Sequence, residues 1–188
     1  MPRKVWYAPN KFESYGEEEI KAVEECLRAG WLAGFGERTI EFEKRVSDYF
    51  DKKHGLFVNS GSSAILVGLC ALDLPKGSEV VTPACGFATT VAPLEQLGLK
   101  PVFCDVDLTS YVTTVEQLRR VVTPETKCLI LPNLIGNVPD WEAIREAFPD
   151  VILFEDSADT MTRTSCTDIS TTSFYASHVI TAGGIGGM

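Results

Sequence analysis

The sequence lacks the features that mark a nucleic-acid binder or a membrane-spanning protein. It has no excess of basic residues: 17 lysines and arginines stand against 26 aspartates and glutamates, which gives a formal net charge of −9. Binding to nucleic acid needs a basic face, so this balance argues against that class of protein. No run approaches the ~18 consecutive apolar residues of a membrane-spanning helix. We therefore expect neither a nucleic-acid partner nor a membrane partner.

Cysteine pairs and histidines are also scarce. The six cysteines form no CxxC pair and there are only two histidines, so the spacing suits neither a zinc site nor a dense disulfide framework. We expect no metal site. The basic residues Arg3 and Lys4 are followed by no apolar stretch of the kind found in a secretory signal. With 45% hydrophobic and 23% charged residues, the composition is that of a globular chain, and we expect a cytoplasmic protein.

Helical and strand-like stretches alternate along most of the chain. Apolar residues at helical spacing predict helices at 17–29, 37–50, 64–72, 88–97, 115–122 and 141–147. Short apolar runs predict strands at 56–58, 79–82, 101–104, 127–131 and 151–154, and strand-like residues recur at 173–175 and 179–181. Strands that alternate with helices at this spacing indicate βαβ units, so we expect an α/β fold with a mainly parallel sheet.

Three short polar stretches carry candidate chemistry, and each also has a plain interpretation. Residues 59–64 open a predicted helix, whose free N–H groups form an anion site that suits a phosphate; a serine N-cap explains the same residues. Asp156 follows a predicted strand and is placed to meet a ligand at the carboxyl end of the sheet, or it belongs to a solvated acidic turn. His178 could be a general acid–base, or it is simply packed.

Taken together and in order, these stretches resemble the DegT/DnrJ/EryC1/StrS family of pyridoxal-phosphate-dependent sugar aminotransferases and dehydratases. The resemblance runs from about Trp31 to the last residue and is carried by residues 30–34, 42–43, 59–64, 77–83, 101–107, 155–158 and 173–178. It implies an aspartate-aminotransferase-like large domain of fold type I, with three layers and a mainly parallel central sheet. Residues 1–30 would then be an N-terminal arm and helix, and 31–188 the cofactor-binding large domain.

Matching the family residue by residue implies a pocket for pyridoxal 5'-phosphate or pyridoxamine 5'-phosphate. Three serines would hold the cofactor phosphate: Ser62, Ser63 and Ser173. Phe87 would stack on the pyridine ring, and Asp156 would pair with the protonated ring nitrogen. Asp159 falls where the family usually has glutamine or histidine near the ring hydroxyl, and we expect it in the same pocket.

His178 occupies the family position of the lysine that binds the cofactor covalently. No lysine follows Lys127. This pattern resembles the branch that removes the C-3 hydroxyl from nucleotide-linked 4-keto-6-deoxyhexoses with histidine as the base, and residues 136–137 also look more like that branch. The resemblance implies a nucleotide-sugar substrate, glutamate as amino donor and a homodimer, and we expect no iron–sulfur cluster in this chain. Two alternatives stay open: a sugar aminotransferase of the same family, and a non-catalytic cofactor-binding fragment.

The sequence ends in a glycine-rich run at 183–187. Such a run normally leads into another element, although a frayed terminus is the plain interpretation. We expect that the chain is the N-terminal part of a longer enzyme and that a small C-terminal domain is absent from it. Apolar surface would then be exposed where that domain packs.

Overall fold

A five-stranded parallel sheet forms the centre of the molecule. The computed structural model describes residues 15–31 and 34–188, so the predicted N-terminal arm and part of the 30–34 stretch lie outside the described residues. The strands are arranged in the order β2-β1-β3-β4-β5, and every neighbouring pair is parallel. Their bounds are Glu79–Pro83 for β1, Lys100–Cys104 for β2, Thr126–Pro132 for β3, Ile152–Ser157 for β4 and Ile169–Thr172 for β5.

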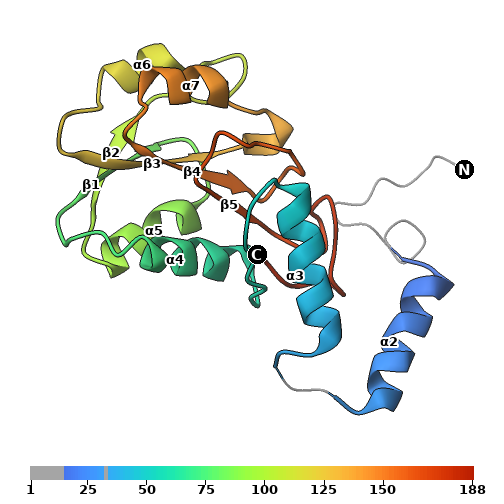
Figure 1. Cartoon of the computed structure of the whole chain (residues 1–188). Coiled ribbons are helices and arrows are strands. Elements are labelled where there is room, and N and C mark those ends of the chain that lie inside the picture. Colours follow the sequence, from blue (N-terminus) through green and yellow to red (C-terminus); the bar gives the residue numbers. More distant parts are fainter. Residues whose placement is uncertain (1–14, 32–33) are drawn as a thin grey trace, which may run out of the picture.

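Helices cover both faces of the sheet and complete a three-layer α/β fold (Figure 1). One face carries α4 (Gly61–Ala71) and α5 (Ala88–Gln96), and the other carries α6 (Val115–Arg119) and α7 (Trp141–Ala147). Successive strand residues point to opposite faces. In β4, Phe154 accordingly joins the buried cluster with Ile65 of α4, while Leu153 joins the cluster with Trp141 of α7. The expected three-layer fold with a mainly parallel sheet is confirmed.

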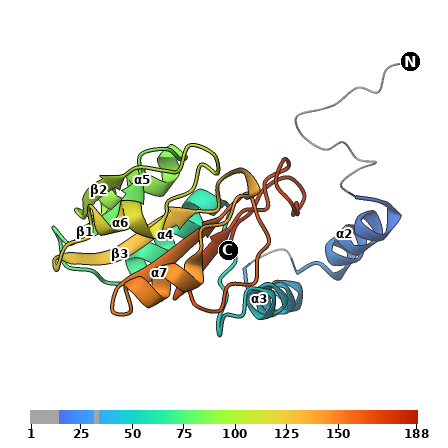
Figure 2. The same cartoon turned by 90° about the horizontal axis from the view of Figure 1, so that it is seen from above.

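Two further helices lie to one side of the sheet (Figure 2). The helix α2 (Glu17–Ala29) ends at Gly30 in the left-handed conformation, as expected for a C-terminal cap, and it buries none of its residues. The helix α3 (Glu37–Tyr49) packs through Val46 against Phe50 and Phe174. No helix within residues 15–31 and 34–188 combines the length and apolar content needed to cross a membrane.

The last two glycines of the glycine-rich run, Gly186 and Gly187, are buried beside the start of α4. Gly187 pairs with both Val58 and Ser173, and Gly186 pairs with Ser60, each as an isolated bridge. A Cβ at Gly187 would overlap the backbone of Ser60 and Gly61. Glycine is therefore required there for a close approach of two backbone segments, and the frayed-terminus interpretation is wrong.

Three strand predictions are wrong. Residues 56–58 form only the bridge at Val58, because Phe57 packs sideways into the aromatic cluster with Phe42 and Phe174. Residues 174–175 and 179–181 lie outside any strand. The fifth strand instead comes earlier, at Ile169–Thr172, and the chain leaves the sheet where the Phe174 ring is buried under α3.

Candidate functional site

A cavity of about 650 Å³ opens at the carboxyl ends of the strands. The chain runs from β1 to β2 on one side and returns to build β3 on the other side of β1. The connections after β1 and β3 therefore diverge and leave a crevice, which is where open α/β sheets bind ligands. Of the site residues that the sequence predicts, the following line this cavity: Ser62, Phe87, Asp156, Asp159, Ser173 and His178.

The first turn of α4 forms one end of the cavity. Ser60 caps this helix, because its hydroxyl accepts a hydrogen bond from the Ser63 backbone N–H at 3.1 Å. Ser63 serves this cap and is not among the residues that line the cavity, whereas Ser62 is. A Cβ at Gly61 would lie 2.9 Å from the Cβ of Ser173, so glycine lets Ser173 approach the helix start. A helix N-terminus flanked by two serine hydroxyls suits an anion such as a phosphate.

Asp156 lines the cavity near the end of β4 and is buried. Burial raises the pKa of its carboxyl group, and two hydrogen bonds oppose this shift by stabilising the charged form. The Thr90 hydroxyl donates to Oδ2 at 2.8 Å and the Ala158 backbone N–H donates to Oδ1 at 3.3 Å. The solvated-turn interpretation of Asp156 is therefore wrong. A buried carboxylate in this position can bind the protonated nitrogen of a ring.

His178 lies beside Asp159 in the cavity wall. Its Nε2 is 3.8 Å from Oδ1 of Asp159, and Oδ2 of the same carboxylate accepts the Ile135 backbone N–H at 3.1 Å. The Nδ1 atom of His178 is buried and has no hydrogen-bond partner among the residues that the structure describes. One ring nitrogen is thus beside a carboxylate, and the other is not committed to a neighbouring side chain.

Phe87 is an aromatic side chain that lines the cavity and is exposed to solvent. It precedes the first residue of α5, and 70% of its surface is exposed, so it does not pack in the core. Burial of aromatic surface is favourable. An exposed phenyl ring beside a cavity therefore favours a flat ligand that can stack on it.

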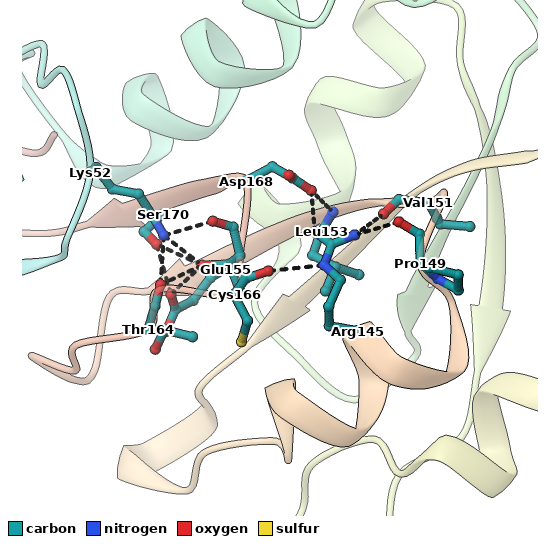
Figure 3. A network of polar contacts seen from close by, with 11 residues as sticks. Lys52, Arg145, Pro149, Val151, Leu153, Glu155, Thr164, Cys166, Asp168 and Ser170 are labelled. Atoms are coloured by element: carbon teal, nitrogen blue, oxygen red, sulfur yellow. Dashed lines mark hydrogen bonds and ion pairs between the residues drawn. The ribbon is translucent and has the colours of Figure 1, made fainter.

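Glu155, the neighbour of Asp156, points to the other face of β4 and belongs to a second buried polar network (Figure 3). Its carboxylate is fully buried and accepts hydrogen bonds from an amide and several hydroxyls: Asn133, Ser157, Thr162, Thr164, Thr167 and Ser170. Lys52 Nζ donates to the backbone oxygens of Thr164 and Thr167 at 2.6 and 2.7 Å. Burial lowers the pKa of Lys52, and the charge of Glu155 opposes this shift. The network anchors the connection between β4 and β5.

Two further residues contribute to this site without being predicted from the sequence. Thr90 lies 66 residues from Asp156 in the sequence, and no local sequence pattern predicts a contact between them. Asn133 lines the cavity, accepts a hydrogen bond from the Trp141 indole at 3.1 Å and donates to Glu155 at 2.7 Å. Its place directly after β3, at the carboxyl edge of the sheet, is the signal that could have identified it.

Comparison with known proteins assigns the chain to one family. The profile of the DegT/DnrJ/EryC1/StrS aminotransferase family matches residues 13–188, and the chain belongs to this family. It is 35% identical over 185 residues to the lipopolysaccharide biosynthesis protein RfbH of Salmonella typhimurium, covering 89% of this chain and 42% of that protein. It is 33% identical over 184 residues to the dTDP-4-dehydro-2,3,6-trideoxy-D-glucose 4-aminotransferase of Saccharopolyspora spinosa, covering 92% of this chain and 47% of that protein.

Solved structures agree with the family assignment. The fold matches a GDP-4-keto-6-deoxymannose-3-dehydratase with a trapped PLP–glutamate geminal diamine, with a TM-score of 0.86 and 28% identity. This match covers 98% of the present chain and 50% of the other. The chain thus spans about half the length of the relatives that it matches, and these relatives include both dehydratases and aminotransferases.

Proposed function

We propose that the chain is the cofactor-binding part of a pyridoxal- or pyridoxamine-phosphate-dependent enzyme that removes the C-3 hydroxyl from a nucleotide-linked 4-keto-6-deoxyhexose. The observation that carries this proposal is His178 in the same cavity as Asp156 and Ser173. Among the described residues that line the cavity there is no lysine. Covalent attachment of the cofactor needs a lysine amine, so non-covalent binding with a histidine free to move protons is the arrangement that these residues favour.

The residues present fit the cofactor at both of its ends. In the proposed arrangement the start of α4, Ser62 and Ser173 hold the phosphate, and Gly61 leaves room for this close approach. The exposed ring of Phe87 stacks on the pyridine, and Asp156 binds the ring nitrogen. When bound, the cofactor supplies an electron sink. Ser63 acts on this pocket only through the cap of α4, because its amide and hydroxyl both contact Ser60.

His178 is the proposed proton carrier. An imidazole can accept a proton and return it at neutral pH, and Nδ1 of His178 has no partner within the described part of the chain. With the cofactor bound, His178 would accept a proton from the C4′ carbon of the cofactor and deliver it to the C-3 hydroxyl, which leaves as water. Asp159, at 3.8 Å from Nε2, stabilises the positive charge that the ring carries between these two events.

The organisation of the whole enzyme is part of the same proposal. Residues 31–188 would form the cofactor-binding large domain and residues 1–30 an N-terminal arm and helix, which agrees with a helix α2 that has no buried residue. We propose a homodimer as the working form and glutamate as the amino donor. The remaining length of the relatives would supply the nucleotide-sugar contacts.

A spectroscopic and product assay tests this function. The purified protein is loaded with pyridoxal phosphate and treated with glutamate and a nucleotide-linked 4-keto-6-deoxyhexose. We expect cofactor absorbance that borohydride does not fix to the protein, glutamate-dependent loss of the pyridoxal band, and a sugar lighter by one water. The variant His178→Lys is the positive control for covalent attachment.

The other outcomes identify the alternatives. A borohydride-fixed adduct in the wild-type protein, or an amino sugar as product, favours the sugar aminotransferase and overturns the dehydratase. Cofactor binding without any turnover favours a non-catalytic cofactor-binding role. Failure of the wild-type chain to bind the cofactor overturns the proposed function as a whole.

A further inference from the structure

Thr90 and Asp156 form a buried side-chain hydrogen bond that joins two elements. Thr90 is the third residue of α5 and Asp156 lies in β4, and their exposed fractions are only 2% and 6%. The oxygen–oxygen distance of 2.8 Å is that of a well-formed hydrogen bond. A threonine hydroxyl has one proton to donate, and an ionised carboxylate only accepts. The Thr90 proton is therefore committed to Oδ2 of Asp156.

The position of Thr90 in α5 adds a second effect. The first turn of a helix carries a partial positive charge that favours a nearby anion, and Thr90 places Asp156 beside that turn. Phe87 directly precedes the same helix and lines the same cavity. The start of α5 therefore determines both the position of the exposed Phe87 ring and the orientation of the buried Asp156 carboxylate.

We propose that Thr90 is a positioning residue of the cofactor site, an inference that rests on the proposed function. Its hydroxyl fixes Oδ2 of Asp156 and favours the charged form of the buried carboxyl group, which leaves Oδ1 to face the ring nitrogen of the cofactor. Within the described part of the chain, Oδ1 accepts one hydrogen bond, from the Ala158 backbone N–H at 3.3 Å, and retains a lone pair that can accept another. Without Thr90 the carboxylate would rotate more freely and would lose a donor that offsets the cost of its burial.

The contact can be measured in the chain without any cofactor. Carbon-13 NMR of the Asp156 carboxyl group, assigned with Asp156→Asn, is followed against pH in the wild type and in Thr90→Ser, Thr90→Val and Thr90→Ala. We expect the two variants that lack the hydroxyl to raise the pKa of Asp156 by about one unit or more, and Thr90→Ser to restore the wild-type titration. Thr89→Val, one residue away, should leave the titration unchanged, because the structure gives Thr89 no hydrogen bond to Asp156.

A wild-type titration in Thr90→Val or, if that variant does not fold, in Thr90→Ala would overturn the inference. A second measurement adds pyridoxal phosphate labelled with nitrogen-15 in its ring. We expect the ring nitrogen to lose its proton at a lower pH in Thr90→Val than in the wild type, with Thr90→Ser behaving as the wild type. If the ring nitrogen titrates identically in all of them, Thr90 has no role toward the cofactor. If the wild type binds no cofactor, the proposed function fails, while the carboxyl titration still decides the Thr90–Asp156 contact.

Discussion

Replacing Gly187 by alanine should separate the last residues of the chain from the start of α4. The added Cβ would overlap the backbone of Ser60 and Gly61, and backbone atoms cannot rotate away as a side chain can. Gly187 also exchanges two hydrogen bonds with Val58, at 2.8 and 2.9 Å. Relief of the overlap breaks these bonds, and each lost bond lowers the free energy of unfolding by about 0.5–1.5 kcal/mol. Overpacking lowers it further, by about 1–3 kcal/mol. We expect the free energy of unfolding to fall by about 2–6 kcal/mol.

Urea denaturation of Gly187→Ala beside Gly86→Ala measures this effect. Gly86 is the matched control, because the nearest atom to a Cβ there is 3.8 Å away, and we expect Gly86→Ala to change the free energy of unfolding by less than about 1 kcal/mol. Cofactor affinity should also drop in Gly187→Ala, since Ser60 and Ser62 move with the displaced turn. Equal stability of the two variants would refute the close-approach argument for Gly187.

Three further changes test the proton carrier, the buried network and the cofactor carboxylate. His178→Asn should lower the dehydration rate by ~10²–10⁴-fold while the absorbance of the bound cofactor persists; an unchanged rate would remove His178 from the reaction. Glu155→Gln replaces an acceptor oxygen with a donor that faces hydroxyl groups, and should cost about 2–4 kcal/mol of stability in urea, whereas the exposed Glu142→Gln should cost almost none. Burial raises the pKa of Asp156 in the folded state, so its ionisation opposes folding as pH rises from the ordinary aspartate pKa through the raised value. Asp156→Asn should therefore raise the melting temperature of the cofactor-free chain at neutral pH but not below the ordinary pKa, and an equal gain at both pH values would contradict this cause.

The alternation of helices and strands could be predicted because it depends on local apolar spacing. The helix at 141–147 and the strand at 151–154 agree with α7 and β4, although β4 extends to Ser157. The strand β5 was missed because its residues, Ile169 to Thr172, are mostly hydroxylic. They are stabilised by contacts such as that of Ser170 with Glu155, at 2.7 Å, which no short pattern reveals.

Long-range contacts explain the remaining differences at the site. The order of strands and the family resemblance place Asp156, Ser173 and His178 at one edge of the sheet, and the structure brings them into one cavity. Whether a serine faces that cavity or caps a helix depends on the exact start of α4, which separates Ser62 from Ser63. The Thr90 contact depends on how α5 packs over the sheet, where its main strand contacts are with β1 and β2, and this is a property of the assembled layers.

Glu155 and Asp156 are consecutive residues of β4 whose side chains point to opposite faces of the sheet. This arrangement limits which changes of sequence the strand can tolerate. Because side chains alternate along a strand, a shift of β4 by one residue would exchange the two carboxylates between the hydroxyl-lined compartment and the cavity. Glu155 would then lose its six donors, and the cavity would lose the carboxylate that Thr90 holds. Conservative apolar exchanges at Leu153 or Phe154 leave this arrangement in place. Insertion or deletion of a single residue within β4 does not, so the length of this segment should vary less than its composition.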